Sequence, residues 1–214
     1  MTPKIVLIPG DYWHAPGPLV TSIQTALQPL ACTLEVFVDP AAIPFPTLHE
    51  FDLIILAKGG ENPAQRDENW LSENQEALLE TYVAQGGRLL AIHGGVCGYR
   101  EGGPVRRIMK GHFVSHPPEH DLVVRVTDHE HPVCRHIEEF SIFDEQYQLD
   151  VDPAETKVIL ESNSPTYGVQ IAGWTHPVGE GHFLGLTPGH TQPVLFHPEV
   201  QKLIRQSVEW LLPE

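Results

Sequence analysis

The sequence has few of the residues that would mark a disulfide-rich or membrane protein. Its 214 residues include three cysteines, Cys32, Cys97 and Cys134, an odd and widely spaced set. Such a set does not make a disulfide framework, and no Cys-x-x-Cys pair indicates a zinc site. No apolar run approaches the length of a transmembrane helix, and the run that begins near Ile5 is too short for a signal peptide. We therefore expect a cytoplasmic protein.

Basic residues are scarce as well. Thirteen Lys and Arg stand against 28 Asp and Glu, so the formal net charge is −15. A charge of this sign disfavours the phosphate backbone of a nucleic acid or an anionic membrane surface as a partner. We expect a small neutral ligand instead, with no nucleic acid and no membrane. The sequence leaves open whether the chain forms a homo-oligomer.

Strand-like and helix-like patterns alternate through the first half of the chain. Short apolar runs with the length of buried strands occupy residues 4–8, 34–38, 51–57 and 88–92. Between them, helical spacing of apolar residues predicts a helix from about Pro18 and another over 73–83. Ser72 and Gln75 form a weak capping-box signal before the second helix, and Gly86 is a stop signal after it. This order predicts a mostly parallel sheet with right-handed crossovers.

The second half of the chain is rich in strands and poor in helices. Short strands are predicted at 122–126, 157–161, 169–174 and 182–186, with a turn at 177–181. A final helix begins near Pro198 and carries an apolar stripe. No internal repeat or linker is present. We therefore expect one domain over residues 1–214, an α/β fold of three layers with an antiparallel C-terminal extension.

The stretch from Gly86 to Gly98 contains the first candidate for chemistry, His93. This histidine follows the buried run 88–92 directly and precedes two glycines. Ligands of α/β sheets bind beyond the carboxyl ends of the parallel strands. Glycines there permit the tight backbone that a nucleophile or an acid/base group requires. The alternative is a histidine that caps a helix on an ordinary glycine-rich turn, and this stretch alone gives both interpretations similar weight.

His190 is the second candidate. It follows the predicted strand 182–186, which can lie beside the strand 88–92 in a doubly wound sheet. The carboxyl end of that late strand would then bring His190 near His93. The alternative is a loop histidine in a glycine-rich turn.

Two adjacent carboxylates, Asp144 and Glu145, lie in an apolar segment. Buried carboxylates are costly unless they are paired or hydrogen-bonded. Neighbouring residues of a strand point to opposite faces, so we expect only one of the two in a site. The alternative is a pair of surface acids that flank a buried Phe143.

Histidine and proline are unusually frequent, with 13 and 20 residues. Proline favours extended geometry at the residue before it, so we expect the histidines of the four His-Pro pairs on strand ends and loops. These are His116, His131, His176 and His197. Most of them are expected to be ordinary surface residues.

Two further segments are weaker candidates. His112 and His116 have the spacing of metal ligands on a helix, but Gly111 and Pro117 predict a loop there, and no His-Glu-x-x-His motif occurs. The cluster Tyr12-Trp13-His14 follows the first predicted strand. Its aromatic rings suit a sugar as well as a hydrophobic core, and the sequence does not separate these two interpretations.

The segment Ala91-Ile92-His93-Gly94-Gly95 resembles the strand-turn-helix elbow of class I glutamine amidotransferases, whose pattern is Gly-x-Cys-x-Gly. Histidine stands at the position of the cysteine, so the thiolate of glutaminase chemistry is missing. Cys97 lies four residues further on and is poorly placed to replace it. Phe196-His197-Pro198-Glu199 is similar to the motif that supplies histidine and glutamate in that family. However, it opens the terminal helix, so His190 is the better candidate.

From about Gly86 to its end, the chain resembles the trehalose-utilisation (ThuA-like) family of this fold. Each motif is weak alone, but their order and spacing make a specific match, whereas the first third fits only as a generic strand-helix pattern. The matching motifs are Gly86-Gly87, Ile92-His93-Gly94, Gly111-His112-Phe113, His116-Pro117, His131-Pro132, Asp144-Glu145-Gln146-Tyr147, Trp174, Gly179 to Gly181 with Phe183, Gly189-His190, and Pro198-Glu199-Val200 with Trp210. The resemblance implies a glutamine amidotransferase-like or flavodoxin-like fold and a role linked to carbohydrate.

The resemblance also implies that His93, Glu145 and His190 converge as catalytic residues at the carboxyl end of the sheet. They could hold a divalent metal such as zinc with an open position, or act as acid and base without any cofactor. His14 and His116 are expected at the rim. The expected substrate-binding residues are Trp13, His14, Gly60, Gly94, His116 and Tyr147.

Three hypotheses of function follow. The leading one is an enzyme that acts on a sugar or keto-sugar derivative by acid/base or metal-assisted chemistry, through hydrolysis, isomerisation or proton abstraction next to a carbonyl. It is not a glutaminase, because His93 replaces the cysteine. The second is a sugar-binding or regulatory module of the same fold without catalysis. The third is a hydrolase that uses Cys97, although the position of this residue argues against it.

Overall fold

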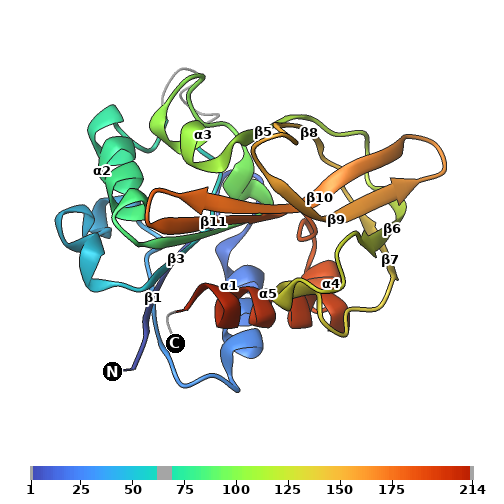
Figure 1. The fold of residues 1–214 in the computed structure, drawn as a ribbon, viewed down its shortest axis with the longest axis horizontal. Coiled ribbons are helices and arrows are strands. Elements are labelled where there is room, and N and C mark those ends of the chain that lie inside the picture. Colours follow the sequence, from blue (N-terminus) through green and yellow to red (C-terminus); the bar gives the residue numbers. More distant parts are fainter. Residues whose placement is uncertain (1, 62–68, 213–214) are drawn as a thin grey trace.

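The computed structural model describes residues 2–61 and 69–212. A nine-stranded sheet forms the centre of the molecule, in the order β2-β1-β3-β4-β11-β10-β9-β6-β7 (Figure 1). Its first five strands are parallel: β2 (Thr33–Val36), β1 (Lys4–Pro9), β3 (Leu53–Ala57), β4 (Arg88–Ile92) and β11 (Gly181–Leu186). The other four extend it in antiparallel order: β10 (Gly168–Val178), β9 (Lys157–Ser164), β6 (His120–Val126) and β7 (Phe140–Asp144). The predicted fold class is confirmed.

Helices cover both faces of the parallel half, which explains why its inner strands are apolar throughout. The helices α1 (Pro16–Leu27), α4 (Gln192–Leu195) and α5 (Pro198–Leu211) lie on one face. The other face packs against α2 (Glu73–Ala84), α3 (Pro104–Met109) and the 3-10 helix η2 (Phe45–Glu50), which follows the short 3-10 helix η1 (Pro40–Ala42). The three layers are visible in Figure 1, where α2 and α3 lie above the sheet and α1 and α5 below it.

Local signals set the ends of the second helix. The Ser72 hydroxyl accepts a hydrogen bond from the backbone N–H of Gln75, and the Gln75 side chain accepts one from the N–H of Ser72. The predicted capping box is thus present, and it satisfies two amides that the first turn leaves free. After the helix, Gly86 has a φ of +109°, a conformation that favours glycine. The first helix begins at Pro16 rather than near Pro18.

The late strand β11 lies parallel to β4, as predicted. Phe183 is in register with Leu89, and Leu186 is in register with Ile92. The chain therefore leaves both strands at the same edge of the sheet. The segment that begins with His93 and the one that contains His190 start side by side.

The antiparallel half is anchored by a buried tryptophan on β10. The indole N–H of Trp174 donates a 2.8 Å hydrogen bond to the carbonyl of Met109. The ring lies over Gly185 of the neighbouring strand, where a Cβ atom would come within 2.8 Å of it. This contact holds β10 against β11 and α3, so the extension continues the core.

The predicted loop at 111–117 is wrong in its first part. Residues Gly111–Ser115 form strand β5, which pairs antiparallel with β8 (Gln148–Val151) in a separate two-stranded sheet. The partner strand is distant in sequence, so no local pattern announces the pair. Gly111 is required at this crossing, because a Cβ atom would lie 2.7 Å from Val151. Pro117 follows the strand and breaks it.

The expectation for the four His-Pro histidines is wrong at His176. This residue lies inside β10 and is buried, because the strand continues to Val178 through Pro177. The predicted turn at 177–181 is correspondingly shorter. His131 and His197 instead begin helices, η4 (Pro132–Cys134) and α5, where each ring accepts a backbone N–H. His116 lies beyond the end of β5.

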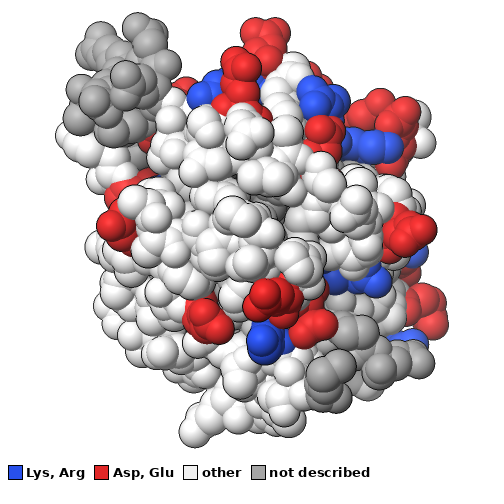
Figure 2. Space-filling view, turned by 90° about the vertical axis from the view of Figure 1, so that its left-hand side faces the viewer, with Lys and Arg blue, Asp and Glu red and all other residues white. Residues whose placement is uncertain are grey.

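Two further features bear on partners. Within the described ranges, no helix is both long and apolar enough to cross a bilayer. Figure 2 shows one face of the molecule, on which Asp and Glu side chains, with fewer Lys and Arg among them, are scattered around a broad uncharged centre. The negative charge of the chain is therefore spread over this face rather than gathered in one patch.

Candidate functional site

His93 begins a 3-10 turn, η3 (His93–Val96), directly after β4. Its φ is +47°, in the left-handed region that non-glycine residues seldom adopt. The glycines that follow are required by close packing: a Cβ on Gly95 would lie 2.0 Å from the Leu56 carbonyl oxygen. On Gly94, it would lie 2.7 Å from a carboxylate oxygen of Asp11. This strained strand-to-turn geometry is that of a nucleophile elbow, occupied here by histidine.

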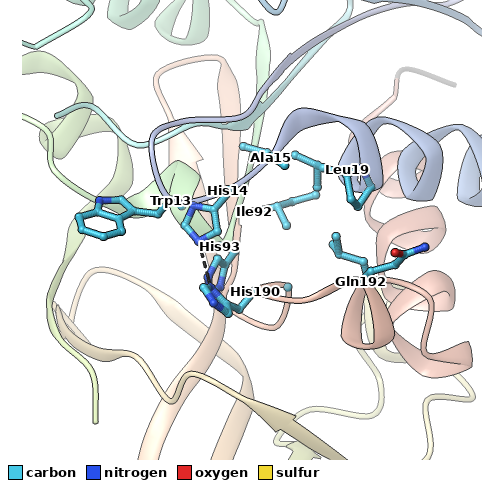
Figure 3. Close-up of a pocket in the computed structure, with 13 residues that line it drawn as sticks. Trp13, His14, Ala15, Leu19, Ile92, His93, His190 and Gln192 are labelled. Atoms are coloured by element: carbon cyan, nitrogen blue, oxygen red, sulfur yellow. Dashed lines mark hydrogen bonds between the residues drawn. The ribbon is translucent and has the colours of Figure 1, made fainter. Parts of the chain in front are cut away.

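Four side chains from distant segments converge above this turn: His14, His93, Glu145 and His190. Nε2 of His93 lies 3.3 Å from Nδ1 of His190 and 3.4 Å from Oε2 of Glu145. Nδ1 of His190 lies 3.3 Å from the same carboxylate oxygen and 3.2 Å from Nε2 of His14. Figure 3 shows the three imidazoles side by side, with Trp13 pointing away from them. His14, expected at the rim, thus lies in the centre.

The outer nitrogens of two of these rings are held by acceptors. Nδ1 of His93 lies 2.7 Å from the Thr187 carbonyl oxygen, and Nδ1 of His14 lies 2.8 Å from Oδ1 of Asp11. In a neutral ring the proton therefore sits on Nδ1, and the Nε2 lone pair points toward the centre. Asp11 is itself oriented, because its Oδ2 accepts the backbone N–H of Gly59 at 2.8 Å.

Asp11 is suited to this role because it remains ionised. Burial by itself raises the pKa of Asp11, but the hydrogen bond and charge of His14 and the amide of Gly59 outweigh it and lower the pKa to about 2. An ionised carboxylate behind His14 keeps the ring in one orientation.

Asp144 positions the third ring. Its Oδ2 accepts the backbone N–H of Gly189 at 3.0 Å, and its Oδ1 accepts that of His190 at 3.2 Å. Asp144 is 1% exposed, and this burial raises its pKa although the neighbouring His93 and the amides oppose the rise. It acts behind the cavity and orients the segment that carries His190.

Only one of the two adjacent acids, Glu145, lines the cavity, as expected, while Asp144 lies behind it. The reason given from strand alternation does not apply, because Asp144 ends β7 and Glu145 lies beyond the strand. The alternative with a buried Phe143 is wrong, because this side chain is 55% exposed.

The charges of Glu145 and His93 support each other. Burial alone raises the pKa of Glu145, but the hydrogen bond to His93 and the nearby imidazoles outweigh it and lower the pKa. Burial alone would lower the pKa of His93, yet Glu145 and Asp144 together raise it. For His190, burial is the largest effect, and it lowers the pKa of this ring. The site thus contains an ionised carboxylate, Glu145, between one imidazole with a raised pKa, His93, and one with a lowered pKa, His190.

Tyr147 and His116 complete the polar surface. The Tyr147 hydroxyl lies 2.9 Å from Nε2 of His93, and the two rings stack with centroids 4.4 Å apart. Burial raises the pKa of Tyr147 well above its ordinary value, so its hydroxyl stays protonated at neutral pH. Nε2 of His116 lies 3.4 Å from Oε1 of Glu145, the oxygen that faces away from His93. Glu145 is therefore contacted on both of its oxygens.

A cavity of 650 Å³ opens above this cluster. Aromatic walls alternate with charged groups around it. Its lining comprises Asp11, Trp13, His14, Gly59, Glu61, Gly94, Cys97, Gly98, Arg106, Phe113, Val114, His116, Glu145, Tyr147 and His190. A smaller cavity of 140 Å³ lies on the other side of the histidines, against Leu19 and Ile92 in Figure 3. His14 and His190 line both cavities, and His93 lines the smaller one.

The structure brings all but one of the expected substrate-binding residues to the large cavity. The exception is Gly60, whose N–H donates to the Cys97 carbonyl at 2.9 Å and whose neighbour Gly59 lines the cavity instead. Sequence reasoning missed Asp11 and Arg106. Asp11 had a usable signal, an acid directly after the first strand. Arg106 had none, because α3 reaches the cavity only through its packing.

Cys97 lies in the cavity wall, but its chemistry does not suit a nucleophile. Burial raises the pKa of its thiol from 9.0 to about 12, with the charges of Asp11 and Glu145 adding to the effect. The attacking species in cysteine catalysis is the thiolate. A thiol with this pKa is protonated at neutral pH, which argues against a hydrolase based on Cys97.

The fold and the elbow together define an α/β protein of the amidotransferase-like type with histidine in place of the nucleophilic cysteine. A family model described as trehalose utilisation (ThuA) matches residues 9–211. The chain therefore belongs to the ThuA family. The match includes most of the N-terminal third, where the sequence motifs alone were generic.

Solved structures support the same assignment of fold. A ThuA-like protein from Parabacteroides merdae is 16% identical with a TM-score of 0.81, and the match covers 98% of this chain and 90% of that chain. A ThuA-like protein from Bacteroides uniformis is 17% identical with a TM-score of 0.75, covering 98% and 92%. A cytoplasmic protein from Salmonella typhimurium is 14% identical with a TM-score of 0.72, covering 100% of both chains. A search of curated proteins found no match.

Proposed function

We propose that this protein is an enzyme that acts on a sugar or keto-sugar derivative through acid–base chemistry at His93, Glu145 and His190. One observation carries the proposal: an ionised carboxylate lies against three imidazoles, and it lines a 650 Å³ cavity together with two of them, His116 and His190. A volume of this size suits a small molecule, for which pockets of about 300–1,000 Å³ are usual. Membership of the trehalose-utilisation family supports a carbohydrate as that molecule.

The walls of the cavity suit a sugar as well. Trp13, 70% exposed, and Phe113 offer aromatic faces, against which the apolar side of a sugar ring can pack. Arg106 and Glu61 add donors and acceptors for hydroxyl groups. We propose a carbohydrate ligand and no nucleic-acid or membrane partner, in keeping with the acidic net charge of −15. A cytoplasmic location, as described for the Salmonella neighbour, is part of the proposal.

The reaction that fits these groups best is removal of a proton from a carbon next to a carbonyl. Glu145, with its lowered pKa, is ionised and can take the proton as the C–H bond breaks. The electron pair moves to the carbonyl oxygen, where the protonated Tyr147 hydroxyl can stabilise the developing charge. Return of the proton to the former carbonyl carbon, with transfer of the α-hydroxyl proton to the oxygen that took up the charge, gives isomerisation. Departure of a β-substituent with its bonding electron pair, as the carbonyl re-forms, gives elimination.

The proposal is tested by incubating the protein with a panel of glycosides, aldoses and keto-sugars in heavy water. Proton NMR should show loss of the signal of the carbon-bound hydrogen next to a carbonyl, together with product. We expect Glu145→Gln to lower turnover by about 100- to 10,000-fold, the usual contribution of a general base. Phe143→Ser is the matched control, because this exposed side chain lies two residues away and points elsewhere.

Two outcomes would contradict the proposal. Full turnover by a folded Glu145→Gln variant would remove Glu145 from the chemistry. Binding of a sugar by calorimetry, with neither exchange nor product across the panel, would instead support a sugar-binding module without catalysis.

A further inference from the structure

We propose that His14, His93, His190 and Glu145 form a binding site for one divalent transition-metal ion, with zinc as the best fit. The inference deepens the proposed function, because the ion would lie at the same centre. Its evidence is separate, since it comes from the arrangement of donor atoms rather than from the cavity or the family.

Four of the six distances between the inward-facing atoms match the edges of a tetrahedral ligand shell. The atoms are Nε2 of His14, Nε2 of His93, Nδ1 of His190 and Oε2 of Glu145, and one ligand atom from each of these residues lies within 4.8 Å of the others. Four of their separations are 3.2, 3.3, 3.3 and 3.4 Å. Zinc–ligand bonds of about 2.0–2.1 Å in tetrahedral geometry place two ligands about 3.3–3.4 Å apart. Octahedral neighbours at the same bond length would lie only about 3 Å apart.

When the rings are neutral, hydrogen bonding does not satisfy every contact of this cluster. The ring protons of neutral His14 and His93 lie toward Asp11 and Thr187, so both rings present lone pairs to the centre. The Tyr147 hydroxyl can donate to His93, and a proton on Nδ1 of His190 can serve one further contact. The remaining close contacts then bring acceptors against acceptors, which is unfavourable, unless His93 gains a second proton that it shares with Glu145. A cation at the centre takes the place of that proton and attracts all four ligand atoms at once.

The outer contacts are those of metal-binding histidines, which usually donate their second N–H to a carboxylate or a backbone carbonyl. Asp11 provides the carboxylate for His14, and Thr187 provides the carbonyl for His93. Both rings are thus oriented by groups that do not contact the ion. Three imidazoles and one carboxylate suit zinc, iron or nickel better than magnesium or calcium, which prefer oxygen ligands.

The site has an accessible side. The 650 Å³ cavity reaches His14, Glu145 and His190, so a hydroxyl or carbonyl oxygen of a substrate can approach as a fifth ligand. An ion there would polarise that oxygen as a Lewis acid.

The test measures metal directly. The full-length protein is stripped with a chelator, exchanged into zinc or cobalt, desalted and analysed by inductively coupled plasma mass spectrometry. We expect about one ion per chain, and a strong visible absorption of the cobalt protein, as four- or five-coordinate cobalt gives. Glu145→Gln and His190→Ala should each weaken binding by more than about 100-fold, and Asp11→Asn by about 10- to 100-fold.

The control is His129→Ala, which removes an exposed histidine in the turn after β6 that is none of the four ligands and should leave the metal content unchanged. Circular dichroism verifies that each variant is folded. Equal metal retention by wild type and His190→Ala, or no retained metal in the wild type, would overturn the inference. One bound ion without any turnover would support the site and contradict the proposed function. Turnover by a protein that retains no metal after exchange would support the proposed function and contradict the site.

Discussion

Two groups of histidines lie at opposite ends of strand β11, and they differ in the partners of their ring nitrogens and of the nearby carboxylates. The site group, His14, His93 and His190, lies beyond the carboxyl end of β11. The second group, His131, His176 and His182, lies toward its beginning, around Trp210. Both line depressions in the surface, and both contain buried rings. A count of histidines would not separate them.

The histidines of the second group pack against aromatic and backbone groups. His131 and His182 lie edge-on to Trp210, with centroids 4.9 and 5.5 Å away. His176 donates from Nε2 to the carbonyl of Ile108 at 2.8 Å. Burial is the largest cause that lowers the pKa of all three rings. These histidines are therefore kept neutral as aromatic parts of the core and its margin.

The carboxylates explain the difference. Near the second group, Asp128 pairs with Lys157 at 2.5 Å and Glu155 with Lys110 at 2.6 Å, so lysines already neutralise the acids. At the site, the partners of Glu145 are the imidazoles themselves. Two features distinguish the site group from the second group. Glu145 has imidazoles as its ion-pair partners, and the Nδ1 atoms of His14 and His93 are hydrogen-bonded to Asp11 and Thr187, which fixes the orientation of both rings.

The largest expected effect comes from removing one ring of each group. His190→Ala should lower turnover of the substrate found by NMR by about 100- to 1,000-fold, because it removes a contact of Glu145 on the cavity floor. His182→Ala, at the start of the same strand, should stay within about twofold of wild type, as surface changes away from a site do. Steady-state kinetics of both variants measures the contrast. A comparable loss in the two variants would mean that β11 transmits packing defects and that the site is not localised.

An intermediate effect is expected from Asp144→Ala. The substitution leaves the backbone N–H groups of Gly189 and His190 without their buried acceptor, at a cost of about 1–3 kcal/mol for an unsatisfied group. Urea denaturation should show this loss in the free energy of unfolding, and turnover should fall because His190 is no longer held. Asp144→Asn, which keeps one carbonyl oxygen, should recover part of both. If Asp144→Ala lost stability but kept full turnover, Asp144 would not be a positioning residue.

The smallest effect concerns pH and the second group. The pKa of His176 is lowered in the folded protein, so as pH falls below its ordinary value near 6.5 the unfolded chain binds a proton first. The free energy of unfolding should then decrease with falling pH, by at most about 1.4 kcal/mol per pH unit for this group. His176→Gln, which cannot titrate, should show a shallower decrease between pH 7.5 and 5.5 in urea titrations. Identical slopes in the two proteins would show that His176 titrates normally.

Much of the fold could be predicted from the sequence because its signals are local. Strand β4 carries a continuous apolar run, the capping box at Ser72 is four residues long, and Gly86 ends a helix. The place of β11 beside β4 was an expectation based on the general arrangement of doubly wound sheets, and the structure has this pairing. By contrast, β5 was missed, since its partner β8 comes more than thirty residues later.

The sequence by itself determined the order of an apolar strand, His93 and two glycines, because these signals are local. The structure decided that this turn is an elbow, since Leu56 and Asp11 leave no room for a Cβ atom on Gly95 and Gly94. The sequence also placed His190 at the end of a neighbouring strand. Only the tertiary structure decided that His14 joins the centre, that Asp144 holds His190 from behind, and that the ion-pair partners of Glu145 are imidazoles. Those facts depend on distances between segments far apart in the chain, which no local pattern encodes.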